Sequence, residues 1–533
     1  MEVSQTISFN AKQYNKFSSL IFEYLTQNKN VDEFYELFPN ESSLIQQAEK
    51  KLKQFQHRKV THQVLSNQMS KLALTDKQKE NLEKFESDNT VTITTGHQLN
   101  LFTGPLYFFY KILQTIKCCE YMQKLHPEIN FVPIFWMATE DHDFEEINHF
   151  YFKNKKYTWN REFGDAVGRM DLKGIDKVFE QFQNDLNTSK NSQQLKDLIN
   201  KSYLSSDNLS QATQKLVQEL FGEFGLLMLD ADDVELKKFM IPAFETDLIH
   251  HKAFEIVSNS NEKLIEKNHN VQVNPREINL FYLNNGVRER IIDENQKFKL
   301  LDSNQTFSRN EILEELKNHP ERFSPNVILR PLYQETILPN IAYIGGSGEI
   351  AYWLQLKDFF ESQNVLFPVL IVRNSLLNLS EKQNSILERL GINHRDLFLS
   401  KQELINQFIQ SNLGVEIDFE RYEVQLNQIF DELEELSTQT DVTFSKMVNA
   451  QRTKQLKGFD KMKKRLIKAE KRKQSDKVER LSELYDVVYP YSNLQERIVN
   501  FSELYLEYGN DLIDKMYAEI QPINFQFTIK ILA

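Results

Sequence analysis

Five short apolar runs constrain the fold of this chain more than any other feature. Four of the runs are continuous and apolar, and the one at residues 91–95 is a β-branched run of Val, Ile and Thr; both patterns are typical of strands buried within a sheet. Stretches with apolar residues at helical spacing, such as Leu106 to Leu125, separate the runs. Together they predict a parallel sheet covered by helices on both faces, a doubly wound α/β fold. The five runs are residues 91–95, 131–138, 226–229, 341–344 and 365–372.

The first run ends in a turn of polar residues. Sheets of this kind bind ligands outside the carboxyl ends of their strands, so residues that follow the runs are the candidates for function. Here they are Gly96, His97, Gln98 and Asn100. Gly96 permits a tight turn, and the other three can present hydrogen-bond donors to a bound anion. We expect His97 to be functional, with a structural histidine in a turn as the alternative.

The second run leads directly into Glu140, Asp141, His142 and Asp143. Carboxylates at the end of a strand can hold a substrate amine, act as a base or bind Mg²⁺, and an imidazole can move protons near neutral pH. We expect these four residues to be catalytic, and a solvated acidic loop is the alternative. One histidine without a second at helical spacing does not specify a zinc site.

A glycine-rich turn follows the fourth run and contains Gly345, Gly346, Gly348 and Glu349. It formally matches the dinucleotide pattern G-x-G-x-x-G/A, but the next run ends at Arg373 and not at the acid that would bind a ribose, which argues against NAD. What remains is a backbone cradle for a phosphate or carboxylate. A plain turn between a strand and a helix is the alternative.

Several arginines stand in mixed apolar and amide surroundings outside these turns. Arginine in such a setting favours bidentate binding of carboxylate or phosphate, although each one alone is more often part of a structural ion pair. Together they indicate a site for a small substrate with several negative charges. The candidate binding residues in this group are Arg276, Tyr282, Arg288, Arg290, Arg330 and Gln334.

The C-terminal third has a different pattern. Residues 416–441 hold nine acids and one arginine around a heptad seam, whereas residues 451–480 hold 13 Lys and Arg against four Asp and Glu. The simplest interpretation is an antiparallel coiled-coil hairpin in which an acidic arm faces a basic arm. Binding of nucleic acid by the basic arm is the alternative. The seam consists of Tyr422, Leu426, Ile429, Leu433 and Leu436.

Composition limits the class of protein. A net charge of −12 argues against a general nucleic-acid binder, and neither a signal peptide nor a membrane-spanning run is present, so we expect a cytoplasmic protein. The neighbouring Cys118 and Cys119 are predicted to be small core residues. We divide the chain into an N-terminal helical region (1–90), a core with inserted segments (91–400), a coiled-coil hairpin (401–490) and a segment that returns to the core (491–533).

Six motifs occur along the chain in a fixed order. They are Thr95 to Gln98, Leu101 to Tyr107, Phe135 to Phe144, Arg330 to Glu335, Gly345 to Tyr352 and Leu494 to Arg497. The ordered set, which is far more specific than any one motif, resembles the family of cysteine-adding enzymes of bacillithiol biosynthesis, the cysteine ligases. The likeness extends from the N-terminal helices through the last segment, and family members often have Gln where this chain has His97.

The resemblance implies a Rossmann-like core, a coiled coil that mediates homodimerisation, and the last step in the synthesis of a low-molecular-weight thiol. In that step cysteine is joined to glucosaminyl-malate. Because an amide cannot form from a free carboxylate without activation, we expect ATP, with or without Mg²⁺, and a cysteinyl-phosphate or an adenylate as the activated species. We expect neither a tightly bound metal nor a nucleic-acid or membrane partner.

The residues can be assigned roles in this reaction. Gly96 to Asn100 would bind the activated group, Glu140 to Asp143 would receive the amine and its proton, and the arginines would hold malate carboxylates or nucleotide phosphates. Two other functions stay open from the sequence. One is a metal-dependent hydrolase that uses Glu140 to Asp143, and the other is a scaffold that works through the coiled coil without catalysis.

Overall fold

The computed structural model describes residues 3–14, 16–284, 286–295, 297–412, 419–437, 439 and 442–532. The chain forms two compact units. The larger unit comprises Ile7–Leu377 and Asn493–Thr528, and the smaller comprises Asn378–Ser492 with a few residues from each end of the chain. The domain boundaries that we drew from the sequence at residues 90, 400 and 490 stay predictions.

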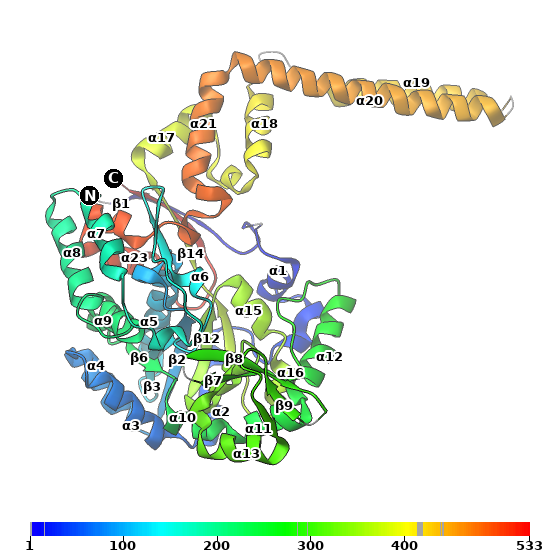
Figure 1. Cartoon of the computed structure of the whole chain (residues 1–533). Coiled ribbons are helices and arrows are strands. Elements are labelled where there is room, and N and C mark those ends of the chain that lie inside the picture. Colours follow the sequence, from blue (N-terminus) through cyan, green and yellow to red (C-terminus); the bar gives the residue numbers. More distant parts are fainter. Residues whose placement is uncertain are drawn as a thin grey trace. The chain divides into compact units, whose positions relative to one another are not determined.

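The centre of the larger unit is a five-stranded sheet with the order β13-β12-β2-β3-β6, in which every neighbouring pair is parallel (Figure 1). It confirms the doubly wound α/β fold, and each strand coincides with one of the five apolar runs. β13 begins four residues later than its run because Pro368 has no N–H for the ladder. The strands are β2 (Thr90–His97), β3 (Asn130–Met137), β6 (Leu227–Asp230), β12 (Asn340–Gly345) and β13 (Val369–Val372).

The register brings the polar strand ends to one edge of this sheet. In the pairing of β2 with β3, Gly96 lies opposite Trp136 and His97 opposite Met137. On the other side of β2, Thr94 lies opposite Tyr343 of β12, and the N–H of Arg373 donates to the carbonyl of Gly345. The turns after four strands therefore meet at the carboxyl edge, where the sequence predicted a ligand site.

The core of the sheet is formed by the apolar strand residues and by helices packed against them. Cys118 and Cys119 of α5 are buried in this core, and burial raises the pKa of Cys118 to about 12. They are structural residues, as predicted. The N-terminal region is helical, also as predicted. The helices are α1 (Ser19–Leu25), α2 (Glu41–Gln54), α3 (Arg58–Met69), α4 (Asp76–Glu86), α5 (Tyr107–Leu125), α15 (Ser347–Trp353) and α16 (Lys357–Ser362).

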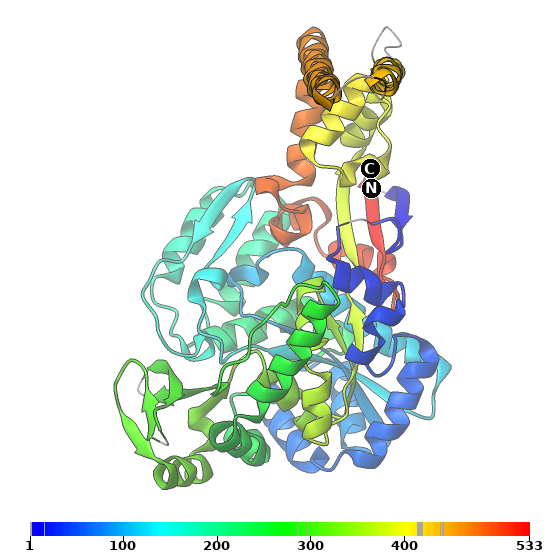
Figure 2. The ribbon, with the colours of Figure 1, turned by 90° about the vertical axis from the view of Figure 1, so that its right-hand side faces the viewer.

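Two long insertions interrupt the sheet. The first lies between β3 and β6 and contains α6 (Phe144–Ile147), β4 (His149–Phe152), β5 (Lys155–Thr158), α7 (Ile175–Asn184), α8 (Lys190–Ser202) and α9 (Leu209–Phe221). The second lies between β6 and β12 and includes an antiparallel sheet with the order β10-β9-β8-β7-β11, drawn in green in Figure 2. The elements of this second insertion are α10 (Val234–Lys237), α11 (Ile241–His250), α12 (Lys252–Glu266), β7 (Leu280–Asn284), β8 (Val287–Asp293), β9 (Lys297–Leu300), β10 (Thr306–Ser308), α13 (Arg309–Asn318), β11 (Phe323–Pro325) and α14 (Leu329–Ile337).

The C-terminal segment returns to the core of the larger unit. Helix α22 (Phe501–Tyr508) packs on α8, and α23 (Asp511–Glu519) packs on α5. Glu496 forms a buried bidentate ion pair with Arg373, with the shorter N–O distance at 2.7 Å. A further sheet has the order β1-β15-β14, with β1 (Val3–Phe9), β15 (Phe527–Leu532) and β14 (Ser375–Ser380).

The smaller unit contains the predicted coiled-coil hairpin. Arg452 contacts Asp431 and Asn427, and Asn449 contacts Glu434, so the two long helices run antiparallel. None of the described helices is long and apolar enough to cross a membrane. The helices are α17 (Glu381–Leu390), α18 (Lys401–Ser411), α19 (Phe419–Ser437), α20 (Val442–Lys473) and α21 (Ser475–Val488).

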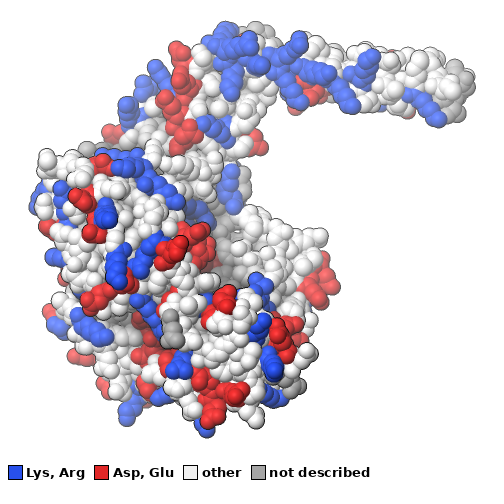
Figure 3. All heavy atoms as spheres, in the orientation of Figure 1, with Lys and Arg blue, Asp and Glu red and all other residues white. Residues whose placement is uncertain are grey.

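One detail of the hairpin differs from the sequence interpretation. The seam does not face α20, because Tyr422, Ile429 and Leu436 are about half exposed while Phe430 is buried. Between the arms, Arg452 of the basic arm pairs with Asp431 and Glu434 of the acidic arm. Most basic side chains of α20 point to solvent (Figure 3). Positions 416–418 and 441 of the acidic arm lie outside the described residues.

The buried pair of Arg373 and Glu496 leads to a prediction about stability. Glu496→Gln leaves the Arg373 guanidinium buried without its counter-charge, so we expect a loss of about 3 kcal/mol in the free energy of unfolding. Glu219→Gln breaks an exposed pair with Lys201 and should cost less than about 0.5 kcal/mol. Urea denaturation of both variants measures the difference, and equal costs would contradict the prediction.

Candidate active site

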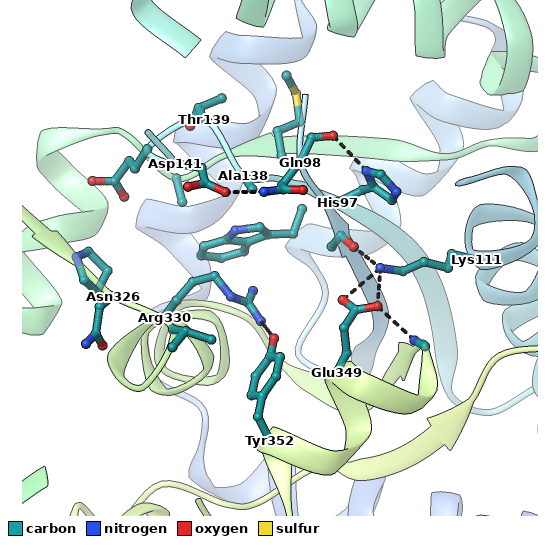
Figure 4. A pocket seen from close by; sticks show the side chains of 18 of the residues that line it. His97, Gln98, Lys111, Ala138, Thr139, Asp141, Asn326, Arg330, Glu349 and Tyr352 are labelled. Carbon is teal, nitrogen blue, oxygen red and sulfur yellow. Dashed lines mark hydrogen bonds and ion pairs between the residues drawn. The ribbon is translucent and has the colours of Figure 1, made fainter. Parts of the chain in front are cut away.

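A cavity of about 580 Å³ lies at the carboxyl edge of the parallel sheet, within the larger unit (Figure 4). It is walled by the turns after β2, β3 and β12, by β8 and by α14. The structure therefore brings together residues that are more than 250 positions apart in the sequence, such as Gly96 and Glu349. The predicted site residues that line the cavity are Gly96, His97, Gln98, Glu140, Asp141, His142, Arg288, Arg330, Gly346, Gly348 and Glu349.

Other predicted site residues do not line the cavity. Asp143 caps the N-terminus of α6, with its carboxylate accepting from the Glu146 N–H. Tyr282 donates its hydroxyl hydrogen to Glu315 at 2.7 Å. Gln334 is buried and accepts from Arg330, so it contacts a cavity residue instead of a ligand. The remaining members of this group are Asn100, Arg276, Arg290 and Gly345.

An ion pair between the buried Lys111 and the partly buried Glu349 forms the base of the cavity. Lys111 of α5 reaches the carbonyl of Gly96 and both carboxylate oxygens of Glu349, at 2.9 and 2.8 Å for Glu349. Glu349 also accepts from the Tyr343 hydroxyl and the Gly346 N–H, each at 2.8 Å. Burial opposes ionisation of Glu349, but Lys111 and these donors outweigh it and lower the pKa of Glu349 to about 2.

This arrangement changes the interpretation of the glycine-rich turn. The sequence suggested that its backbone N–H groups cradle a phosphate or a carboxylate. In the structure the N–H of Gly346 already donates to the carboxylate of Glu349, which caps the short helix α15. The anion in the cradle is therefore a side chain of the protein itself.

Asp141 presents an ionised carboxylate to the cavity. It accepts from Gln98 Nε2 at 2.7 Å and from the backbone N–H groups of His142 and Asp143. Burial opposes its ionisation, but the adjacent side chain of His142, the Gln98 amide and the two backbone N–H groups hold the pKa of Asp141 well below its usual range. Gln98 also donates to Glu146, which fixes its amide. Asp141 is thus suited to bind a cation.

The protonation of His142 follows from its neighbour Arg288. The guanidinium Nη1 of Arg288 donates to His142 Nδ1 at 2.7 Å, and a guanidinium has no acceptor, so Nδ1 carries no hydrogen. The hydrogen of the neutral ring is then on Nε2, which makes His142 a donor. Arg288 itself stacks on Phe281, with its central carbon 3.7 Å from the ring centre, and burial lowers the pKa of Arg288 to about 10.

Glu140 differs from its neighbour Asp141 because it already has a cationic partner. Its carboxylate contacts Lys237 of α10, a side chain with no exposed surface, and Lys237 also lies 3.8 Å from Asp232. Burial raises the pKa of Glu140, and the contact with Lys237 opposes this shift. We assign Glu140 to the wall of the cavity.

Arg330 lies among aromatic side chains. The central carbon of its guanidinium is 5.7 Å from the ring centres of Trp136 and Tyr343 and 5.9 Å from that of Trp353. Gln334 and Tyr352 accept hydrogen bonds from it. In the part of the chain that the structure describes, Arg330 forms no ion pair with an acid. Its positive charge is therefore available to an anionic ligand.

Sequence reasoning missed part of the cavity wall. Arg373 was noted only as evidence against NAD, and Arg497 only as part of a family motif. Lys111 offered a usable signal, because it is a lone charge among apolar residues at the start of a predicted helix. Within the described ranges, no group of three or more His, Cys, Asp or Glu side chains is placed to hold a metal ion. The missed lining residues include Tyr107, Lys111, Trp136, Thr139, Asn326, Tyr343, Tyr352, Arg373 and Arg497.

The fold and the cavity together define a class of protein: Rossmann-like α/β proteins with a C-terminal coiled coil and a cavity lined by charged side chains at the carboxyl edge of a parallel sheet. Two family models match nearly the whole chain. Residues 1–374 match the N-terminal Rossmann-like domain of bacillithiol biosynthesis BshC, and residues 376–532 match its C-terminal coiled-coil domain. The chain belongs to the BshC family of bacillithiol biosynthesis.

Relatives with the name "Putative cysteine ligase BshC" cover almost the full chain. The protein of Christiangramia forsetii is 46% identical over 97% of both chains, and that of Flavobacterium psychrophilum is 45% identical over 98% of both. A more distant relative from Staphylococcus saprophyticus is 28% identical over 87% of this chain and 88% of its own. The family resemblance seen in the sequence is confirmed.

The lowered pKa of Glu349 predicts a pH-dependent contribution to stability. A carboxyl group whose pKa is lower in the folded protein stabilises it above its unfolded pKa, and that stabilisation is lost as the pH falls toward the folded pKa. Wild type should be about 2 to 3 kcal/mol more stable than Glu349→Gln at pH 7. The difference should shrink as the pH falls from about 4.5 toward 2. Urea denaturation across this range tests it, and a difference independent of pH would contradict it.

Proposed function

We propose that this protein is a cysteine ligase that joins cysteine to glucosaminyl-malate. The observation that carries the proposal is the charge pattern of the cavity: an ionised carboxylate, Asp141, and a cation without an acidic partner in the described chain, Arg330, face the same space. Cysteine carries an ammonium and a carboxylate, and glucosaminyl-malate carries an amine and two carboxylates. Both proposed substrates thus match the charges of the site, and the names of the relatives agree with cysteine as one of them.

Amide formation requires that the cysteine carboxylate be activated, and we propose that ATP, with or without Mg²⁺, does this. Activation links a carboxylate oxygen to a phosphorus of ATP and breaks a P–O bond of the triphosphate, with release of ADP for a cysteinyl-phosphate or of pyrophosphate for an adenylate. The glucosamine nitrogen then forms the C–N bond, the C–O bond breaks with release of the phosphate or nucleotide, and the nitrogen loses one proton. Because ATP and reduced thiols are held in the cytoplasm, we place the reaction there.

The residues of the cavity can be given roles in this reaction. Asp141 binds the attacking amine and stabilises the positive charge that develops on its nitrogen during attack, because its own carboxylate stays ionised. His142 donates through Nε2 to an oxygen that gains charge, since Nδ1 is occupied by Arg288. Arg330 holds a malate carboxylate or a phosphate. Glu140 and Asp143 take no direct part, because one is paired with Lys237 and the other caps α6.

A homodimer through the coiled coil is a second part of the proposal. The exposed seam residues Tyr422, Ile429, Leu433 and Leu436 recur at heptad spacing along α19, on a side that α20 does not cover. Apolar stripes of this kind are stabilised by burial against a second helix, and a second copy of the chain supplies an identical stripe.

Activity measurements on two neighbouring aspartates test the assigned roles. Asp141→Asn removes the charge that binds the amine, so we expect kcat/KM for glucosaminyl-malate to fall by roughly 100-fold. Asp143→Asn is the matched control, because Asn also caps helices and this position does not line the cavity, and we expect activity within about twofold of wild type. The assay follows the amide product by mass spectrometry with purified protein, ATP, cysteine and glucosaminyl-malate.

Two results would count against this proposal. Absence of the amide product with wild-type protein would reject the ligase reaction itself. Equal loss in the two variants, with both proteins folded by circular dichroism, would reject the role of Asp141 alone.

The dimer proposal predicts that the mass in solution depends on the seam. Placing charges on it with Ile429→Glu and Leu436→Glu should convert the wild-type dimer to a monomer, whereas Glu432→Gln on the same helix should leave the dimer intact. Analytical ultracentrifugation measures the mass. A monomeric wild-type protein, or a dimer that survives both charged substitutions, would refute the proposed interface.

A further inference from the structure

His97 lines the cavity in one defined tautomer. Its side chain is buried, with 7% of the residue exposed, and Nδ1 lies 2.8 Å from the backbone carbonyl oxygen of Gln98. A carbonyl oxygen can only accept a hydrogen bond, so Nδ1 carries the hydrogen and Nε2 is a bare acceptor. Nε2 has no hydrogen-bond partner among the described residues. A buried polar atom without a partner costs about 1 to 3 kcal/mol, which indicates a ligand that donates to it.

The imidazole of His97 stays neutral. Burial lowers the pKa of His97 to about 3, and the nearby positive charges of Lys111 and Arg373 act in the same direction, against a smaller opposite effect of Glu349. A ring with such a pKa cannot exchange protons near pH 7, so His97 is an acceptor and not an acid or base. This differs from the catalytic role that we expected from the sequence.

Arg373 provides a complementary donor at the same end of the cavity. Its two terminal nitrogens bind Glu496, but Nε is buried and has no partner in the described chain. The guanidinium lies over the ring of Tyr107, with a distance of 5.0 Å to the ring centre, and the His97 ring is 5.3 Å from the same centre. Gly346 has no side chain, so it leaves space beside Arg373 Nε. A Cβ at this position would lie 3.7 Å from that nitrogen.

The buried charges at this end are compensated within the protein. Lys111 is paired with Glu349, Arg373 is paired with Glu496, and His97 is neutral. Figure 4 shows His97, Lys111 and Glu349 on one side of the cavity and Asp141 on the other. A carboxylate cannot donate a hydrogen bond to His97 Nε2, and an ammonium group would be repelled by Lys111, Arg373 and Arg497, which also line this cavity. A hydroxyl group fits better, because it both donates and accepts a hydrogen bond without carrying charge.

We propose that His97, Tyr107 and Arg373 form a site for the hydroxyl groups of the sugar ring, in which His97 Nε2 accepts from a hydroxyl and Arg373 Nε–H donates to one. The proposal rests on the proposed function, since glucosaminyl-malate supplies the sugar. It also orients the substrate: the ring hydroxyls lie toward His97, and the amine and carboxylates lie toward Asp141 and Arg330.

Calorimetric titration of the full-length protein with glucosaminyl-malate and with cysteine, which has no hydroxyl group, tests this site. His97→Leu removes the acceptor, so the dissociation constant for glucosaminyl-malate should rise about 3- to 10-fold while that for cysteine stays within about twofold. His97→Gln retains an acceptor and a donor toward Gln98, and it should recover most of the affinity. Because His97 stays neutral, the affinity ratio of wild type to His97→Leu should not change between pH 6 and 8.

The outcomes separate this inference from the proposed function. Unchanged affinity for glucosaminyl-malate in His97→Leu, or an equal loss for cysteine, would overturn the hydroxyl site alone. Binding of glucosaminyl-malate with the expected His97 dependence but without amide formation would support the site and reject the ligase reaction. A wild-type protein that does not bind glucosaminyl-malate would overturn both. The His97→Gln variant guards against misfolding of His97→Leu, and thermal unfolding of both checks it.

Discussion

The ion pair between Lys111 and Glu349 is the interaction on which the geometry of the site depends. Lys111 comes from the helix that follows β2 and also binds the carbonyl of Gly96, whereas Glu349 comes from the helix that follows β12 and also binds Tyr343 and Gly346. One ion pair therefore holds two neighbouring strand ends and the helices after them in a fixed relation. Removing either partner would leave a buried charge, and the cavity base would have to rearrange or admit water.

Charge compensation divides the cavity into parts with different chemistry. Lys111, Arg373 and Lys237 are each neutralised by an acid of the protein, so these strongly charged side chains serve to shape the walls. Asp141 is stabilised by hydrogen bonds and lies 3.7 Å from His142 Nδ1, whereas Arg330 is surrounded by aromatic rings and is not paired with an acid among the described residues. A low-dielectric cavity strengthens the attraction of such groups for a ligand of opposite charge. Some charged residues that the sequence suggests as reactive are thus paired within the protein and are not free to bind the ligand.

The acidic cluster shows how far a sequence pattern can predict a site. Glu140, Asp141, His142 and Asp143 are consecutive and were expected to act together. In the structure they have different partners, because the turn after β3 leads within six residues into the helix that Asp143 caps. Similarly, the sequence correctly predicted the heptad seam of α19 as an apolar stripe. It did not predict that this stripe faces away from α20. Spacing determines which residues share a face, whereas the partner of that face depends on the other elements.

The sequence by itself determined the five buried strands, their alternation with helices, the hairpin near the C-terminus and the family, because each is encoded in local periodicity or in ordered motifs. Only the tertiary structure decided which charges are neutralised. Arg373 and Glu496 are 123 positions apart and Lys111 and Glu349 are 238 apart, so no local pattern links them. Burial also decided the state of His97, since desolvation and neighbouring cations keep its ring neutral. Ionisation depends on the surroundings in space, and the chain order alone does not contain them.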